Sequence, residues 1–407
     1  MRNDQRIVVI ADDITGAAEI AGLAKAMGQS VSLLCATASP LPSAAVTVIA
    51  TDTRSMTEAE AVAETRRIAA SLPSPADSLA EHAAAFLLFK KTDSAIRGHV
   101  VAELKALLNA TGLRRCVYVP ANPSKGRIIR NGIYYIRQKQ DDSRESDGRH
   151  QKSDDCREPH YVPISETAFS YDPEFPARTS VMRDRFPDAD AAAIVMPDAE
   201  TAHDLRRIVS HYDDATTLFA GAADLFEAFL AAASPVASPL TPASEVTSFS
   251  VSSDGVAAPP ALPRSALIIC GSTQSHPLDT GALLCPMPRE VYDGDEGAAF
   301  WFSKLHTSLA RQDSDAPLAL TIPFTHRTGK AVAIHLRTVM AQMARRLVEH
   351  RRPSQLIIEG GATAWAVLHA LGWNTFSIER QIAPGVVQMR ANNGTLVTLK
   401  PGSYPWF

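Results

Sequence analysis

The sequence predicts an α/β fold of two domains, each a mainly parallel sheet flanked by helices. Short apolar runs of strand length alternate with stretches of helical period along most of the 407 residues, which is typical of parallel sheets. A chain of this length accommodates two domains. An Ala-, Ser- and Pro-rich stretch at residues 231–263 interrupts the alternation and predicts a linker. The expected domains are therefore residues 1–230 and 264–407.

Apolar runs in the first domain predict buried strands, with amphipathic helices between them. The predicted strands are Ile7–Ile10, Val31–Cys35, Val46–Ala50, Phe86–Phe89, Cys116–Val119 and Ala192–Met196. Apolar residues at helical spacing predict a first helix that follows Asp12 and Asp13 and stops at Gly28, and further helices over Thr57–Leu72 and Val100–Leu108. The stretch Lys139–His160 is almost free of apolar residues, which predicts a solvated excursion.

The second domain continues the alternation. The predicted strands are Ala266–Cys270, Val291–Tyr292, Leu318–Ile322, Leu356–Ile358 and Thr395–Leu399, with a long helix around Gly329–His350.

Composition argues against several classes of partner. A net charge of -4 gives no reason to expect a nucleic-acid or membrane partner. No apolar run reaches the ~20 residues of a membrane span, and the chain enters its first strand without a signal peptide. Five scattered cysteines suit reduced thiols, so we expect a cytoplasmic protein. The oligomeric state stays open, with a homodimer among the states considered.

Two adjacent acids follow the first predicted strand. Asp12 and Asp13 lie between that strand and the helix that follows it. This position is at the ligand-facing edge of an open α/β sheet. Paired acids suit a divalent cation or a base for a substrate hydroxyl. The alternative is helix capping, which Asp favours. Capping requires only one of the two acids.

Three more polar clusters follow predicted strands of the first domain, so they are expected to converge on one edge of the sheet. Arginine and lysine beside hydroxyl and amide groups suit a small hydroxylated carboxylate, because guanidinium binds carboxylate in a fork. The alternatives are surface charge and structural ion pairs. The clusters are Asp52 and Arg54; Lys90, Lys91, Asp93, Ser94 and Arg97; and Asn122, Ser124, Lys125 and Arg127.

Glycine turns dominate the second domain. A strand, then Gly360 and Gly361, then a helix opened by Thr363 form a good anion site, because glycine lets backbone N–H groups approach phosphate. The segment "GSTQS" after its own strand repeats this pattern, and the alternative for each is a tight turn. "HRTGKA" lacks the spacing of a P-loop. No dinucleotide fingerprint follows a strand, which argues against a nicotinamide dehydrogenase.

Taken together, the motifs resemble the four-carbon acid sugar kinase family. They include "ADDITGAAEIA", "TDTRS", "KKTDSAIRGH", "PANPSKGRIIRNGIYYI", "GSTQSHP", "EGGATA" and "LKPGSYP", and they cover nearly the whole chain in order. The resemblance implies ATP-dependent phosphorylation of a hydroxyl of a tetronate-type acid such as threonate, erythronate or a 3-oxo-tetronate. It also implies that the N-terminal domain binds the sugar acid, that the C-terminal domain binds the nucleotide, and that the active site is the cleft between them.

The resemblance also implies the site residues. Asp12 or Asp13 would be the base or would contact Mg²⁺ brought with ATP, and Lys91 and Arg97 would also take part in catalysis. The substrate side would comprise Asp52, Arg54, Lys91, Asp93, Ser94 and Arg97. The nucleotide side would comprise Ser272, Gly360, Gly361, Ala362, Thr363 and Gly402.

The chain departs from the family's usual motifs in three places. Ala95 stands where a threonine is commoner, Ala362 where an acid is commoner, and Pro401 removes a backbone donor beside the expected phosphate. These changes keep a second interpretation open, in which the chain is a non-catalytic sugar-acid sensor with a degenerate nucleotide domain.

Overall fold

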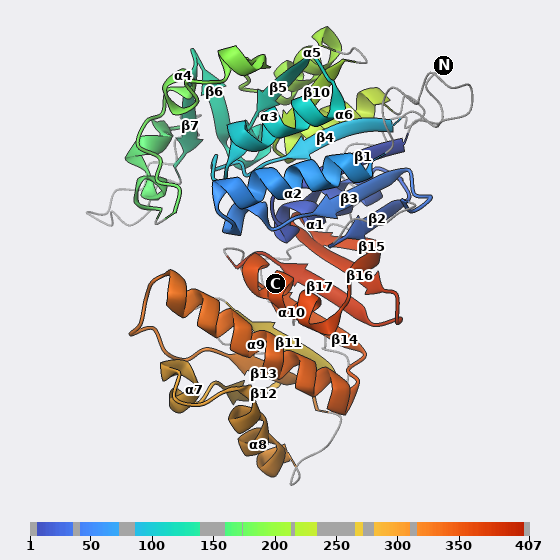
Figure 1. Ribbon diagram of the computed structural model, residues 1–407, viewed down its shortest axis with the longest axis vertical. Coiled ribbons are helices and arrows are strands. Elements are labelled where there is room, and N and C mark those ends of the chain that lie inside the picture. The colour runs from blue at the N-terminus through green and yellow to red at the C-terminus, as the bar shows by residue number, and fades with distance from the viewer. Residues whose placement is uncertain are drawn as a thin grey trace, which may run out of the picture. The chain divides into compact units, whose positions relative to one another are not determined.

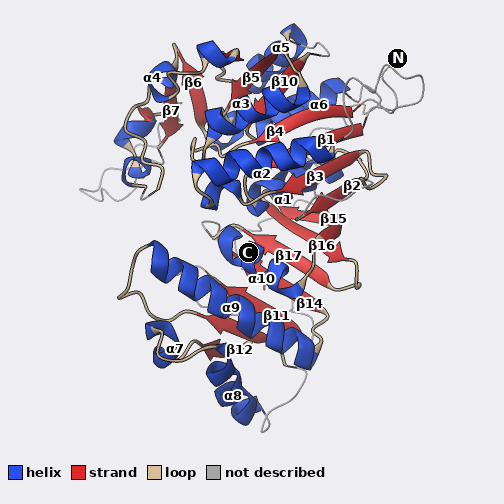
Figure 2. Ribbon diagram, in the orientation of Figure 1, coloured by secondary structure: helices blue, strands red, loops and turns tan. Residues whose placement is uncertain are grey.

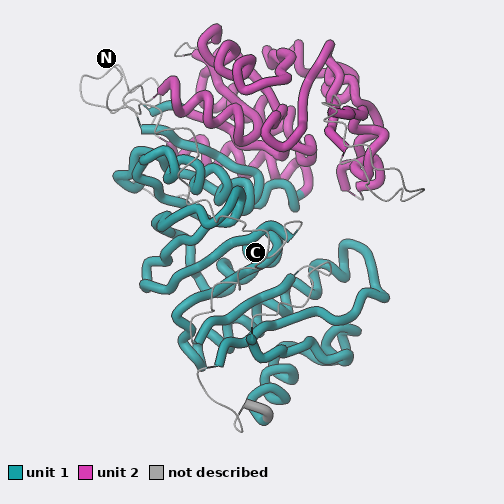
Figure 3. Tube along the Cα trace, turned by 180° about the vertical axis from the view of Figure 1, so that it is seen from behind, with its two compact units in different colours: residues 1–56, 81–87, 234–407 teal, residues 57–80, 88–233 magenta. Residues whose placement is uncertain are grey.

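The computed structural model groups the chain into two compact units. It describes residues 6–35, 41–72, 86–138, 159–172, 174–212, 216–233, 265–271, 281–309 and 316–402. Unit 1 combines residues 1–56, 81–87 and 234–407, and unit 2 combines residues 57–80 and 88–233 (Figure 3). Most of the predicted linker, all but the last two residues of the polar stretch 139–160, and Ser272 lie outside the described residues.

Unit 1 is built on a mainly parallel sheet (Figure 1). Its strands are β1 (Arg6–Ala11), β2 (Val31–Leu34), β3 (Val46–Ala50), β11 (Ala266–Cys270), β12 (Leu283–Pro286), β13 (Leu318–Thr321), β14 (Gln355–Glu359), β15 (Thr375–Ala383), β16 (Val386–Ala391) and β17 (Leu396–Lys400). They pair in the order β12-β13-β11-β14-β17-β16-β15-β2-β3-β1. Pairing is antiparallel from β17 through β16 and β15 to β2 and parallel elsewhere.

Helices flank this sheet (Figure 2). They are α1 (Ile14–Ala26), α7 (Arg289–Asp293), α8 (Ala298–Leu309), α9 (Lys330–Arg351) and α10 (Gly361–Leu371). Helix α1 packs on β15 and β16 and also touches α10, which in turn packs on α9. The strands β1, β3, β11 and β14 are almost wholly buried, as their apolar runs predicted.

Unit 2 has its own parallel strands and a small antiparallel sheet. The parallel strands are β4 (Phe86–Lys91, whose first two residues belong to unit 1), β5 (Arg115–Val119), β9 (Ile194–Val195) and β10 (Thr217–Gly221). The antiparallel strands are β6 (Arg127–Arg130), β7 (Ile133–Arg137) and β8 (Tyr161–Pro163). The helices are α2 (Glu58–Ser71), α3 (Val100–Thr111), α4 (Met182–Arg185), α5 (Ala202–His211) and α6 (Ala223–Ala233).

The structure confirms the predicted fold class, a largely parallel sheet flanked by helices, and corrects single elements. The predicted strand Val291–Tyr292 is wrong: both residues lie in α7, which Gly294 ends with a φ of 93°. Two apolar residues carry too little periodicity to separate a strand from a helix. The predicted strand Ala192–Met196 shrinks to Ile194–Val195, because Ala193 adopts a left-handed conformation. Among the described residues no helix is long and apolar enough to cross a membrane.

Candidate active site

Two polar clusters of unit 1 meet at one edge of its sheet. Strands β1 and β3 are parallel neighbours, and Ala11 is paired with Ala50. The residues that follow, Asp12 and Asp13 after β1 and Asp52 after β3, therefore leave the sheet at the same edge, as the sequence predicted.

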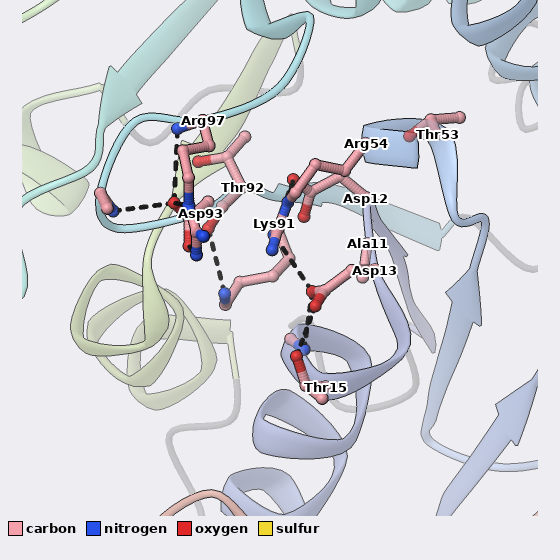
Figure 4. A network of polar contacts seen from close by, with 12 residues as sticks. Ala11, Asp12, Asp13, Thr15, Thr53, Arg54, Lys91, Thr92, Asp93 and Arg97 are labelled. Carbon is pink, nitrogen blue, oxygen red and sulfur yellow. Dashed lines mark hydrogen bonds and ion pairs between the residues drawn. The ribbon is translucent and has the colours of Figure 1, made fainter. Parts of the chain in front are cut away.

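Arg54 bridges the two adjacent acids. Its Nε and Nη2 donate to Asp12 Oδ2 at 3.0 and 2.9 Å, and Nη2 lies 3.1 Å from Asp13 Oδ1 (Figure 4). The Asp12 carboxylate is buried, with 3% of its side chain exposed, whereas 17% of the Arg54 side chain is exposed. The guanidinium expected to bind a substrate carboxylate thus contacts two carboxylates of the protein.

Asp13 also caps helix α1. Its Oδ1 accepts a hydrogen bond from Gly16 N at 2.8 Å, and its Oδ2 accepts one from the Thr15 hydroxyl. A capping aspartate satisfies an otherwise unpaired N–H of the first turn. Capping therefore accounts for Asp13, while Asp12 has a different role as the buried partner of Arg54.

Asp52 differs from both of these acids. Its backbone is left-handed, with φ 55° and ψ 21°, which is uncommon for a residue other than glycine. Ser55 Oγ donates to its Oδ1 at 3.0 Å. Burial raises the pKa of Asp52 to about 6; the Ser55 hydrogen bond and the charges of Arg337 and Arg54 oppose this shift, and the charge of Asp13 adds to it.

Arg337 on α9 is a residue that the motifs missed. Its charge acts on the Asp52 carboxyl, although the two residues lie far apart in the sequence. No local signal marks it, because α9 carries several arginines and only the packing of unit 1 selects this one.

The glycine turn of α10 lies against the first turn of α1. A Cβ added to Gly361 would lie 2.9 Å from Thr15 Cγ2 and 3.5 Å from Asp13 Oδ2. Gly360, at φ 91°, precedes the helix. Unit 1 thus brings together Asp13 and the turn predicted to bind phosphate, and only a residue without a side chain fits at this contact.

The other residues predicted for the nucleotide site have different environments. Thr363 is 6% exposed, and a side chain at Gly271 would overlap it. Ala362 is exposed, and Gly402 lies in the turn that follows β17. The buried Thr363 side chain therefore packs against the backbone at Gly271, directly after β11.

In unit 2, Asp93 accepts hydrogen bonds from other residues of the loop that follows β4. Asp93 Oδ2 accepts hydrogen bonds from Ala95 N at 3.1 Å and from Arg97 Nε at 2.8 Å, and Oδ1 accepts one from Arg97 Nη2 at 3.2 Å (Figure 4). Ile96 has a φ of 58°, a costly conformation for a β-branched residue that often marks a functional loop. Arg185 Nη2 supports it by donating to Ile96 O at 2.9 Å.

Ser94 and the two lysines have distinct surroundings in this unit. Ser94 Oγ accepts from Arg127 Nη1, and Tyr134 donates to Ser94 O at 2.5 Å. Lys91 is 3% exposed and donates to Thr92 O at 3.0 Å. Lys90 points the other way and forms a buried pair with Glu103 at 2.6 Å. Surface charge therefore explains neither lysine.

Residues that follow two short 3-10 turns, Ile164–Glu166 and Ala168–Tyr171, contact this loop. Arg97 Nη1 lies 3.8 Å from Asp172 Oδ2, and the His99 ring meets the Phe175 ring edge-on with centroids 5.3 Å apart. Arg97 therefore lies between two carboxylates, Asp93 and Asp172, and a third carboxylate would compete with them for it.

The cluster after β5 is structural. Ser124 donates from its N and Oγ to Asp224 at 2.8 and 2.7 Å, and Asp224 N donates to Asn122 Oδ1 at 3.1 Å. These bonds attach the turn after β5 to the first turn of α6. Arg127 is the member of this cluster that contacts the loop after β4, through Ser94.

The adjacent acids suit magnesium that arrives with nucleotide phosphates. Among the described residues no group of three or more His, Cys, Asp and Glu side chains could hold a metal ion. Mg²⁺ bound to a nucleotide typically takes one or two protein carboxylates, with phosphate and water oxygens as its other ligands. Asp12 and Asp13 supply two carboxylates, and Arg54 contacts both of them.

Comparisons with known proteins match two family models to different parts of the chain. Residues 7–188 match the model of a sugar-binding N-terminal domain, and residues 305–404 match that of a nucleotide-binding C-terminal domain. The chain belongs to the four-carbon acid sugar kinase family. The family predicted from the motifs is thereby confirmed.

One curated relative and two solved structures extend this result. A D-threonate kinase of Salmonella typhimurium strain LT2 is 28% identical over 176 residues, which are 43% of this chain and only 34% of that protein. A Salmonella typhimurium LT2 structure provisionally named a tRNA synthase is 19% identical with a TM-score of 0.68, over 98% of this chain and 96% of its own. A Haemophilus influenzae protein of the DUF1537 family is 20% identical with a TM-score of 0.62, over 98% and 97%. These two structures share the fold.

Proposed function

We propose that this protein is an ATP-dependent kinase that phosphorylates a hydroxyl of a four-carbon sugar acid. Threonate, erythronate and 3-oxo-tetronates are the candidate substrates, and the terminal O4 is the proposed acceptor. The observation that carries the proposal is the contact in unit 1 between Asp13 and the Gly360–Gly361 turn. An acid beside a phosphate-binding turn is what transfer to a hydroxyl requires.

The nucleotide would bind at the start of α10. The first N–H groups of this helix are unpaired within the helix, and the helix field favours an anion there. Gly360 adopts a φ of 91°, which glycine tolerates, and Gly361 lets the turn lie directly against Thr15 and Asp13. Mg²⁺ bound with the nucleotide would neutralise phosphate charge near Asp12 or Asp13.

The charged side chains of the sequence motifs would bind the sugar acid and activate its hydroxyl. Arg97 would exchange one of its carboxylate partners for the substrate carboxylate, and Lys91 would offset negative charge on the substrate or on the transferring phosphoryl group. Arg54 would keep Asp12 and Asp13 oriented. Asp13 would accept the proton of the attacking hydroxyl or contact the metal.

The test is a screen for substrate-dependent ADP release. The full chain is incubated with ATP, Mg²⁺ and, in turn, threonate, erythronate and their 3-oxo forms, with C3 and C5 acids as controls for chain length. We expect ADP release with at least one C4 acid. Release that no C4 acid stimulates would contradict the proposal.

Calorimetry decides between the kinase and the sensor. A kinase binds ATP–Mg²⁺ and a C4 acid, whereas a sensor with a degenerate nucleotide domain gives heat with the acid alone. The replacements at Ala362 and Pro401 are the features that favour the sensor, because they remove a carboxylate and a backbone donor from the expected nucleotide site.

A further inference from the structure

Three strands of unit 1 end side by side, and each leads into a segment predicted to bind the nucleotide. Cys270 at the end of β11 is paired with Glu359 at the end of β14, and Glu359 is paired with Lys400 at the end of β17. The segments that follow are Gly271, the Gly360–Gly361 turn, and the Pro401–Gly402 turn.

A buried ion pair joins the last residues of β14 and β17. Lys400 Nζ is 2.5 Å from Glu359 Oε1, and 1% of each side chain is exposed. Lys400 Nζ also donates to Pro401 O at 3.2 Å. These contacts place a cation under the Pro401 peptide, in a chain where proline has removed the N–H that other family motifs offer at this position.

Backbone hydrogen bonds extend the pair to the other two segments. Gly360 N donates to Lys400 O at 2.9 Å, and Gly271 N donates to Glu359 O at 3.3 Å. The two charged residues thus contact all three segments, two through their backbone and one through the Lys400 ammonium. Displacement of either residue would move more than one segment.

Stability alone does not explain a buried ion pair. Two charges lose their hydration on burial, and well-packed apolar residues of similar volume often stabilise a protein as well or better. The Lys400–Glu359 pair can orient the backbone segments around it, because hydrogen bonds have preferred directions and apolar contacts do not.

We propose that Lys400 and Glu359 are positioning residues that hold Gly271 and the turns after β14 and β17 in the geometry that binds the nucleotide phosphates. The inference rests on the nucleotide-binding part of the proposed function. The orientation of the Pro401 carbonyl by Lys400 is its central element, since this is the contact that apolar side chains cannot replace.

Unit 2 supplies a matched control. Lys90 Nζ lies 2.6 Å from Glu103 Oε2, with 1% and 2% of the side chains exposed, and Thr65 Oγ1 donates to the same carboxylate at 3.3 Å. This pair is as buried as the first one. It belongs to unit 2, whereas the three nucleotide segments belong to unit 1.

The experiment compares two double variants of the full chain, K400M/E359L and K90M/E103L. Urea unfolding first establishes that each variant folds, and calorimetry then measures the Kd for ATP–Mg²⁺. We expect the Kd to rise at least ~10-fold in K400M/E359L, the equivalent of one hydrogen bond to a charged group. In K90M/E103L the Kd should stay within about twofold of the wild type.

The exchanged pair E359K/K400E covers the case in which the apolar variant does not fold. It keeps a buried cation and anion together but removes the ammonium from the Pro401 carbonyl, so we expect folding with the same loss of ATP affinity. KM for ATP should rise more than kcat falls. Unchanged ATP affinity in a folded variant, or an equal loss in the Lys90–Glu103 control, would overturn the inference.

These outcomes separate the inference from the proposed function. Wild-type protein that binds ATP but phosphorylates no C4 acid would refute the kinase, and the Kd comparison would still decide the role of the pair. Wild-type protein that binds no ATP would overturn both.

Discussion

At the scale of single residues, neighbouring acids of the same type differ because their partners differ. Asp12 is buried against Arg54, Asp13 caps α1 and lies beside Gly361, and Asp52 occupies a left-handed backbone position with a raised pKa. A motif predicts that acids gather at this edge of the sheet. Their separate roles follow from contacts with residues elsewhere in the chain.

Asp13 combines two roles that a pair of substitutions separates. Asp13→Ala removes both the carboxylate and the cap, whereas Asp13→Ser keeps an oxygen for Gly16 N. Both should lower turnover by at least ~10²-fold, the scale of general acid–base catalysis. Asp13→Ala should lower the free energy of unfolding by about 1 kcal/mol more than Asp13→Ser, because serine keeps the cap while both variants lose the contact with Arg54. Steady-state kinetics and urea unfolding measure the two effects, and near-normal turnover in either variant would remove Asp13 from the mechanism.

Asp52 predicts a dependence of stability on pH. Its pKa is about 6 in the folded protein against 3.8 for the unperturbed group, so ionisation costs more in the folded state than in the unfolded state. Its favourable contribution is present below pH ~4 and is lost as pH rises through about 6. Asp52→Asn cannot ionise, and asparagine tolerates the left-handed backbone.

The variant should therefore gain stability over the wild type between pH 4 and pH 7, by about 2 kcal/mol after allowance for solvent screening. Urea unfolding at a series of pH values measures this difference. A difference that stays constant with pH would show that Asp52 keeps an ordinary pKa.

At the scale of secondary-structure elements, α1 connects the acidic motif to the second half of the chain. It packs on β15 and β16 and touches α10. A Cβ on Gly22, in the interior of α1, would lie 2.6 Å from Val387 Cγ2 on β16. Gly22 is therefore required by close packing between a helix and a strand that are distant in the sequence.

Gly22→Ala should destabilise the protein despite the better helix propensity of alanine. The gain in propensity is about 1 kcal/mol, and overpacking of this kind costs about 1–3 kcal/mol. Gly297→Ala is the control, because no atom beyond its chain neighbours lies within 4 Å of the added Cβ. Thermal and urea unfolding measure both variants, and adding Val387→Ala should recover part of the loss through the coupling of touching residues. A more stable Gly22→Ala protein would refute this packing.

At the scale of the whole molecule, the two ends of the chain share one unit. Strand β2 pairs antiparallel with β15, with Leu34 opposite Thr375, and residues 1–56 group with residues 234–407. The N-terminal strands therefore complete a sheet that the C-terminal half begins.

This arrangement predicts that residues 1–233 do not form a stable protein alone. Such a fragment would expose the unpaired edge of β2 and the apolar face of α1, and both features favour aggregation. We expect cooperative unfolding only when a second fragment, residues 265–407, is co-expressed with it. Gel filtration and circular dichroism of the separate and combined fragments test this. A monomeric, cooperatively folded first fragment would contradict the prediction.

Local sequence patterns predicted ten of the 17 described strands but not β6, β7, β8, β10, β12 or the hairpin β15–β16. Buried parallel strands such as β1 and β14 are continuous apolar runs, which a short window detects. Strand β15 buries only Phe376 and Ile378 of its nine residues, so it is not an apolar run that a short window detects. Strand β10 has five residues and includes a terminal glycine, which weakens its pattern.

The sequence by itself determined the α/β class, the family, and the placement of acids, arginines and glycines at the ends of strands. Those properties depend on residues that are close in the sequence, because burial imposes a periodic pattern of apolar residues and turns require particular residue types. Only the tertiary structure decided that Arg54 holds Asp12 and Asp13, that Gly361 lies against Asp13, that Arg337 acts on Asp52, and that Lys400 pairs with Glu359. Each of these contacts joins residues from separate elements, and their energy depends on distance and burial that no local pattern contains.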